Sequence, residues 1–122
     1  MRIVSILLGL AISAPILQAQ PKALFYMTSG QMSVQSFLDH ADKIDILVPT
    51  WYATDVHGMV WGGPNPQVMQ VAREHHVAVM PILSGSAMGT AEYHQFFTDA
   101  TARHAMDEAL VRICKQNGYL GI

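Results

Sequence analysis

Apolar positions along the chain follow two different spacings. Runs that are apolar almost throughout stand at residues 23–27, 44–48 and 77–82, and a fourth begins at residue 119. Between them, apolar residues recur at the i, i+3, i+4, i+7 spacing of an amphipathic helix. Continuous apolar runs are typical of strands that are covered on both faces, as in a parallel sheet. The pattern therefore predicts a series of strand–helix units.

Capping and turn residues predict where the helices begin and end. Ser33 is a candidate N-cap for the first helix, and Asn65-Pro66 predicts the start of a second. A loop rich in Ser and Gly at residues 84–90 is followed by a short helix around residues 92–97. A long third helix is predicted to end at Asn117-Gly118, in the usual C-terminal manner.

The order of these units predicts an α/β fold with a parallel sheet. The Leu47-Val-Pro49 pattern returns in Val79-Met-Pro81, 32 residues further along the chain. Eight units of that length make roughly 250 residues, the usual size of a TIM barrel. We therefore expect the first three βα units of a (β/α)8 barrel plus the start of its fourth strand. A flavodoxin-like domain is the structural alternative.

Residues 1–19 have the features of a secretory signal peptide. Arg2 supplies a minimal positive region, an apolar run extends from Ile3 to Leu17, and Ala19 is a small residue at the expected cleavage point. The run is too short to span a membrane as a helix. We expect a secreted or periplasmic protein without stable membrane insertion, whose barrel portion is residues 20–122. A buried N-terminal strand or helix is the alternative.

Composition indicates a folded domain and disfavours a nucleic-acid partner. Apolar residues make up 51% of the chain, charged residues 13%, and the formal net charge is -2. A chain without a basic surplus has no field that would attract phosphates. Cys114 is the only cysteine, so no intrachain disulfide is expected in an oxidising compartment. Its place on the apolar face of the third helix favours a buried, inert thiol.

One segment carries a resemblance to a known family. Asp45-Ile-Leu-Val-Pro-Thr-Trp-Tyr52, followed by Asp55-Val-His-Gly58, is similar to the second strand and following hairpin of family 18 glycoside hydrolases of the bacterial, spore-wall-associated type. Residues 24–26, 77–82 and 103–121 fall in the order of that family's first strand, third strand and the helix leading into strand 4. The resemblance implies that the parent protein is a chitinase-like enzyme acting on β-1,4-linked N-acetylglucosamine polymers such as chitin or peptidoglycan.

The same resemblance assigns no catalytic residue within this chain. The family signature Asp-Gly-x-Asp-x-Asp-x-Glu would begin at Leu120-Gly121, with leucine in place of the first aspartate, and Ile122 is the last residue. In this family the substrate's own acetamido oxygen is the nucleophile, and the glutamate protonates the leaving oxygen. We therefore expect the chain alone to be inactive. A lectin-like barrel that binds sugar without catalysis, or a product without function, are the alternatives.

Aromatic residues at the ends of predicted strands are the candidate substrate-binding residues. Tyr26, Trp51 and Tyr52 all stand at carboxyl ends of strands, where barrel enzymes place their sites. The flat C–H faces of pyranose rings pack on aromatic rings. We favour this role for Trp51, whereas a core role is equally open for Tyr26 and Tyr52. Trp61 and Met59 would extend the same platform from the hairpin.

The remaining polar residues suggest no further site. Asp55 is interpreted as the residue that starts the turn before Gly58. The six histidines show neither His-Glu-x-x-His nor His-x-His spacing, so we expect no metal site. No cofactor is implied by the family that the chain resembles.

The signal-peptide features generate a first prediction. We expect cleavage before Gln20, because Ala19 is the small residue that follows the apolar run. Intact-mass analysis of the secreted protein should then show the loss of residues 1–19. A mature protein that still begins at Met1 would contradict the expected export.

Overall fold

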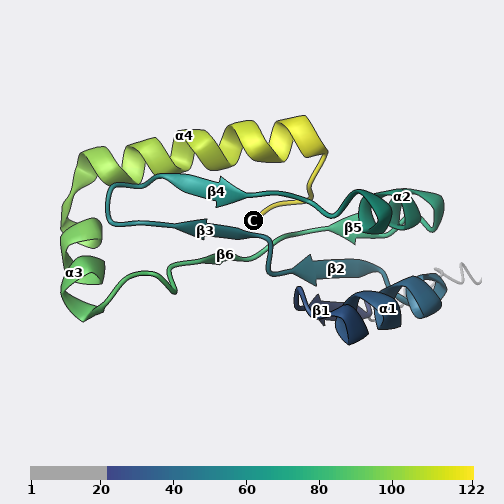
Figure 1. The fold of residues 1–122 in the computed structure, drawn as a ribbon. Helices are drawn as coiled ribbons and strands as arrows, with labels where there is room; N and C mark the ends of the chain where they lie inside the picture. The colour runs from purple at the N-terminus through teal and green to yellow at the C-terminus, as the bar shows by residue number, and fades with distance from the viewer. Residues whose placement is uncertain (1–21) are drawn as a thin grey trace, which may run out of the picture.

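The computed structural model describes residues 22–122, so the predicted signal peptide lies outside the described part. The elements follow in the order β1 (Leu24–Met27), α1 (Gln31–His40), the 3-10 turn η1 (Ala41–Lys43), β2 (Ile46–Pro49), β3 (Tyr52–Thr54), β4 (Val60–Gly62), α2 (Pro66–Glu74), β5 (Ala78–Val79), β6 (Leu83–Ser84), α3 (Thr90–Thr98) and α4 (Ala100–Asn117). The result is a mixed α/β fold with two small sheets (Figure 1). Among residues 22–122, no helix is long and apolar enough to cross a membrane.

The first sheet is parallel, with strand order β1-β2-β5. Its register places Phe25 beside Leu47, and Leu47 beside Val79. The helices α1 and α2 pack against this row, where Phe37 of α1 and Val68 of α2 are fully buried. Full burial of one such side chain is worth about 1.5–3 kcal/mol. This layer is therefore the main core.

The opposite face of the first sheet has little cover. Side chains alternate along a strand, so Leu24 and Tyr26 point away from the face that α1 covers. Leu24 is 46% exposed and Tyr26 68% exposed. Val48 of β2, the register partner of Tyr26, is by contrast only 4% exposed, so the open part of this face lies at β1. Neighbouring large apolar side chains left open to solvent are unusual on a monomer surface.

The second sheet extends from the carboxyl end of the first. β3 and β4 form an antiparallel hairpin, and β6 pairs with β3 in parallel. In the hairpin turn, Oδ1 of Asp55 accepts the N–H groups of His57 (2.9 Å) and Met59 (3.0 Å). Gly58 completes the turn with φ 77°, in the left-handed region that favours glycine. The predicted turn role of Asp55 is confirmed.

A β-bulge lies where the two sheets meet. β2 pairs with β5 at an offset of 32 residues, with Leu47 beside Val79, whereas β3 pairs with β6 at an offset of 31, with Tyr52 beside Leu83. The run from β2 to β3 thus carries one surplus residue, at Thr50–Trp51. Such a bulge bends the strand and redirects the side chains that follow it.

The helix α4 runs along the hairpin, and α3 lies at the hairpin's far end (Figure 1). α4 begins after Asp99, whose Oδ1 accepts the N–H groups of Thr101 (2.9 Å) and Ala102 (3.1 Å). It ends at Gly118 with φ 67°, as predicted. The helix backbone approaches the hairpin turn closely, because a Cβ at Gly58 would lie 1.9 Å from the carbonyl oxygen of Ala102.

One of the two predicted N-caps is confirmed. Oδ1 of Asn65 accepts the N–H groups of Gln67 (3.0 Å) and Val68 (3.2 Å), and α2 begins at the next residue, a proline. The prediction for Ser33 is wrong, because α1 already begins at Gln31. The Ser33 hydroxyl instead accepts a hydrogen bond from the N–H of Thr28, in the turn before the helix.

Two predicted strands are shorter than expected. Residues 77–82 form only the two-residue β5, because Pro49 of β2 has no N–H to donate back to this segment, although the N–H of Ile82 still donates to the Pro49 carbonyl at 2.8 Å, and pairing resumes in β6. Residues 119–122 are not assigned as a strand. Their first ladder bond is nevertheless present, since the N–H of Leu120 donates to the carbonyl of Val79 at 2.8 Å. This bond places the segment at the free edge of β5.

The close approach of α4 to the hairpin generates a prediction for Gly58→Ala. The methyl group would meet a backbone carbonyl, and the positive φ costs a further ~1–2 kcal/mol for an L-residue. We expect the free energy of unfolding to fall by at least about 2 kcal/mol in a urea titration. Gly63→Ala is the matched control, because a Cβ there has no neighbour within 4 Å. Equal stability of the two variants would contradict the contact.

Candidate functional site

A small hollow lies on the second sheet, next to the bulge. It has a volume of about 260 Å³, and its lining includes Thr50, Trp51, Ala53, Trp61, Ser84 and Ser86. Trp61 lies directly opposite Ala53, and Ser84 pairs with Ala53 on the other side. Cross-strand neighbours share a face. One row across three strands thus carries an indole, a methyl group and a hydroxyl.

The position of the hollow is typical of a ligand site. It lies beyond the carboxyl ends of β2 and β5, the edge at which parallel α/β sheets bind ligands. Its volume falls just below the roughly 300–1,000 Å³ of pockets for drug-sized ligands. The hollow therefore suits one small ring rather than a whole oligomer.

Of the two serines of the hollow, Ser84 ends β6 and Ser86 belongs to the loop after it, which is held by local hydrogen bonds. The N–H of Ser86 donates to Oγ of Ser84 (3.1 Å), and the N–H of Met88 donates to the carbonyl of Gly85 (2.8 Å). Serine hydroxyls both donate and accept hydrogen bonds. Together with Thr50 they give the hollow hydroxyl groups beside its two indole rings.

Trp51 is fixed by its backbone as well as by its ring. It is half-buried against the main core, and its ring centroid lies 6.3 Å from that of Tyr119. Gly62 of β4 has φ 120°, and a Cβ there would lie 2.0 Å from the carbonyl oxygen of Trp51. The return strand of the hairpin can therefore pass over Trp51 only because position 62 is glycine.

A buried tyrosine pair lies behind the hollow. Tyr52 is 5% exposed and Tyr119 9% exposed, and their hydroxyl oxygens are 3.0 Å apart. Burial raises the pKa of the Tyr119 hydroxyl well above its usual range, and the hydrogen bond with Tyr52 adds to the rise. The bond ties the segment after α4 to the strand that follows the bulge.

The structure separates the three candidate binding residues of the sequence. Trp51 and Tyr52 both line the hollow, but the burial of Tyr52 favours its core role. Tyr26 lies elsewhere, in a depression of about 490 Å³ on the open face of the first sheet, which Val48 and Met80 also line. Met59 lies in the hairpin turn and is not a lining residue of the hollow.

Sequence reasoning passed over part of this site. Trp61 was only a secondary candidate, yet it faces the hollow and is 45% exposed. Ser84 and Ser86 were assigned to a loop without a role. Their signal was their position, because a Ser-Gly-Ser segment directly after a predicted strand lies at the carboxyl edge of a parallel sheet.

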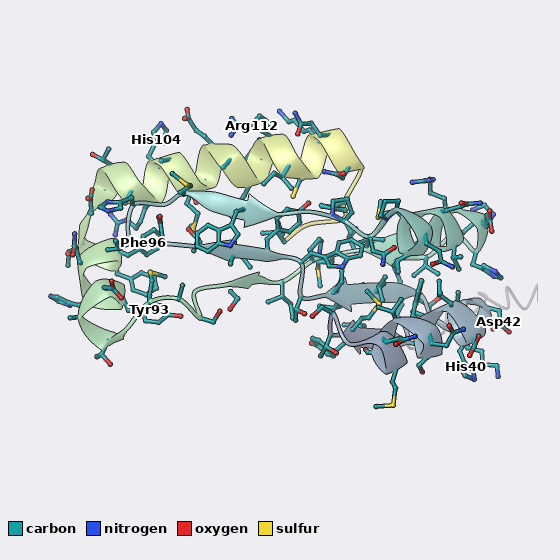
Figure 2. The ribbon with its side chains drawn as sticks, viewed as in Figure 1. His40, Asp42, Tyr93, Phe96, His104 and Arg112 are labelled. Atoms are coloured by element: carbon teal, nitrogen blue, oxygen red, sulfur yellow. The ribbon has the colours of Figure 1, made fainter. Side chains whose placement is uncertain are left out.

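The acidic residues and histidines of the described part form no second site. The lining of the hollow contains no carboxylate, and Asp55 is engaged by the turn amides. Among residues 22–122, no three His, Cys, Asp or Glu side chains lie close enough to hold a metal ion. On the outer face of α4, exposed His104 lies 3.3 Å from exposed Glu108, and it points away from the hairpin (Figure 2). Cys114 is half-buried against the main core.

Comparison with solved structures gives the fold a context. The chain superimposes on the spore cortex-lytic enzyme SleL of Bacillus megaterium with a TM-score of 0.67 and 13% sequence identity, covering 80% of this chain and 25% of that one. For a chitinase from Chromobacterium violaceum the TM-score is 0.67 and the sequence identity 16%, and the match covers 83% of this chain and 33% of that one. For a class V chitinase from Nicotiana tobaccum the TM-score is 0.59 and the sequence identity 15%, and the match covers 82% of this chain and 31% of that one.

The fold is similar to that of chitinases and a cortex-lytic enzyme. The chain spans about a quarter to a third of the length of these proteins. At 13–16% identity, the similarity describes the fold and not the activity. The sequence matches no family model, and no curated relative is similar enough in sequence to be matched.

The tyrosine pair generates a prediction for Tyr119→Phe. The substitution leaves the Tyr52 hydroxyl buried without its partner, which should cost about 1–3 kcal/mol of unfolding free energy. The double variant Tyr52→Phe/Tyr119→Phe removes both hydroxyls and should recover most of that loss. A double variant less stable than the single one, measured by urea unfolding, would contradict a hydrogen-bonded pair.

The raised pKa of Tyr119 adds a pH dependence to the same experiment. A group whose pKa is higher in the folded than in the unfolded state stabilises the fold at low pH and loses this effect as pH rises. The unfolded tyrosine ionises near pH 10. We therefore expect wild-type stability to fall above about pH 10, and less steeply in the double Phe variant. Parallel pH profiles of the two proteins would argue against the shift.

Proposed function

We propose that the chain is the N-terminal part of a secreted glycosidase that hydrolyses β-1,4-linked N-acetylglucosamine polymers. The observation that carries this proposal is the fold similarity to chitinases and to SleL, together with the indole-lined hollow at the carboxyl edge of the strands. The chain would supply the first three βα units of a (β/α)8 barrel and the start of strand 4. Residues 1–19 would direct its export.

The open face of the first sheet supports the barrel. In a TIM barrel, inward-pointing side chains fill the interior in layers, and each layer is contributed by alternate strands. Tyr26 and Val48 are register partners on the face that would point inward, and Met80 lines the same depression. Leu120 pairs with β5 at the edge where a fourth parallel strand would lie. Further strands would cover the apolar side chains that are now exposed.

The hollow supplies binding chemistry for one sugar ring. The C–H face of a pyranose packs on the indole of Trp51 or Trp61, and its hydroxyl and acetamido groups can bond the serine hydroxyls. No lining residue is a carboxylate, so the proton for the leaving oxygen must come from another part of the active site. In substrate-assisted retaining catalysis, the acetamido oxygen of the bound sugar attacks C1 while the bond from C1 to the leaving oxygen breaks and a general acid protonates the leaving oxygen. Water then attacks C1 and opens the cyclic intermediate.

A lectin-like protein is the second candidate. It would use the same hollow and the same contacts but would release the bound sugar unchanged. The absence of carboxylates from the lining of the hollow is the observation that keeps this candidate open. The two candidates therefore differ in whether the bound sugar is cleaved.

Hydrolysis by the full-length secreted protein tests the proposal. We expect the protein to cleave β-1,4-linked N-acetylglucosamine oligomers with retention of anomeric configuration. Proton NMR of the reaction products measures both the cleavage and the configuration. Matched cello-oligosaccharides lack the acetamido nucleophile and should remain intact. Binding of the N-acetylglucosamine oligomer without cleavage would favour the lectin, and equal cleavage of both sugars would contradict the proposed mechanism.

Trp51→Ala separates the binding role of this residue from its core role. If the indole is a sugar platform, the oligomer should bind about tenfold more weakly, which is 1.4 kcal/mol, with a small change in Tm. If the indole is mainly core, the unfolding free energy should drop by about 3–5 kcal/mol. Trp61→Ala is the matched comparison, because that indole is 45% exposed and should weaken binding at little cost in stability. Unchanged affinity in both variants would exclude the hollow as the sugar site.

A further inference from the structure

An aromatic row on α3 reaches toward the serine loop of the hollow. Tyr93 and Phe96 project from α3 toward the ends of β3 and β6 (Figure 2). The Tyr93 ring stacks on Phe97 with centroids 6.3 Å apart and planes 16° apart, and Phe97 meets Phe96 edge to face at 5.5 Å. Phe96 is only 4% exposed. The row is therefore anchored at one end in a buried ring.

Gly85 lies at the other end of this row. A Cβ at Gly85 would lie 2.4 Å from the hydroxyl oxygen of Tyr93, 2.8 Å from its Cζ and 2.7 Å from Cε of Met88. Approaches below 3.0 Å are essentially never seen for real Cβ atoms. The ends of the Tyr93 and Met88 side chains thus lie where a side chain at position 85 would begin, so Gly85→Ala must displace one or both of them.

The contact adds a fixed point to a loop whose other hydrogen bonds beyond the β3–β6 pairing are local. Within the loop, Ser86 bonds the Ser84 hydroxyl, and Met88 bonds the carbonyl of Gly85. Beyond it, α3 begins with the N–H of Gly89 donating to the Glu92 carboxylate at 2.7 Å. The pairing of Ser84 with Ala53 fixes where the segment leaves the sheet, and Tyr93 lies against Gly85, the first residue beyond that pairing.

We propose that Tyr93 is a positioning residue for the sugar site. By resting on Gly85, it holds Ser86 where its side chain lines the hollow, next to Ser84, which the β3–β6 pairing already places there. Tyr93 does not line the hollow itself, so it acts through the loop. The inference rests on the proposed sugar-binding function of the hollow.

A double-mutant cycle on the full-length protein tests this role. Gly85→Ala and Tyr93→Leu should each weaken binding of the β-1,4-linked N-acetylglucosamine trimer about tenfold. Binding is measured by titration with tryptophan fluorescence as the signal. The double variant should also lose about tenfold, because the second change removes a contact that is already lost. Tyr93→Phe keeps the ring and should bind within about twofold of wild type. Gly63→Ala, with no neighbour within 4 Å of its Cβ, is the control.

Two results would overturn the proposal. One is a loss of about a hundredfold in the double variant, since independent effects multiply. The other is wild-type affinity in Tyr93→Leu, which would make the tyrosine a purely structural residue.

Hydrogen exchange distinguishes a failure of this inference from a failure of the proposed function. The amides of Ser86 and Met88 should exchange faster in Gly85→Ala and Tyr93→Leu than in wild type, whether or not a sugar binds. If the wild-type protein binds no trimer, the proposed function fails. The exchange rates alone then decide whether Tyr93 positions the loop. Unchanged exchange in both variants would overturn its positioning role.

Discussion

The ladder between the β2–β3 run and the β5–β6 run is the constraint on which the site depends. Prolines stand at the same level of both runs, at positions 49 and 81, and neither can donate a hydrogen bond. The carbonyl of Pro49 still accepts the N–H of Ile82 (2.8 Å) and of Trp51 (3.1 Å). The two runs therefore stay together across the break, but with one surplus residue. The surplus residue bends the chain between β2 and the hairpin strand β3. Trp51 stands at this bend, beyond the carboxyl end of β2.

Close backbone approaches carry this constraint outward. Glycine at position 62 lets the return strand pass over the carbonyl of Trp51, and glycine at position 58 lets α4 lie against the hairpin turn. Tyr119, directly after α4, then contacts the rings of both Trp51 and Tyr52. Two residues that are adjacent in sequence can meet the same ring because the bulge changes the direction of the strand between the two sheets.

The distribution of buried and exposed surface separates the part of the fold that forms the core from the part that would bind a ligand. One face of the parallel sheet is closed by α1 and α2, whereas the other keeps Leu24 and Tyr26 open. In the proposed barrel, this open face is interior and contributes stability, while the hollow on the second sheet contributes sugar contacts. Core packing and ligand binding would then use different surfaces of the same few strands.

Much of this arrangement follows from the sequence alone. Apolar runs predicted the three parallel strands, Asn65 and Gly118 predicted helix ends, and Asp55 predicted the hairpin turn, because each of these signals is local chemistry. Trp51 was singled out for the same reason, by its position after a strand. The tertiary structure alone decided the register, the bulge, the burial of Tyr52 and the separation of Tyr26 from Trp51. These depend on which segments meet across 30 to 70 residues of chain, as in the bond between Tyr52 and Tyr119, and no local pattern encodes such a meeting.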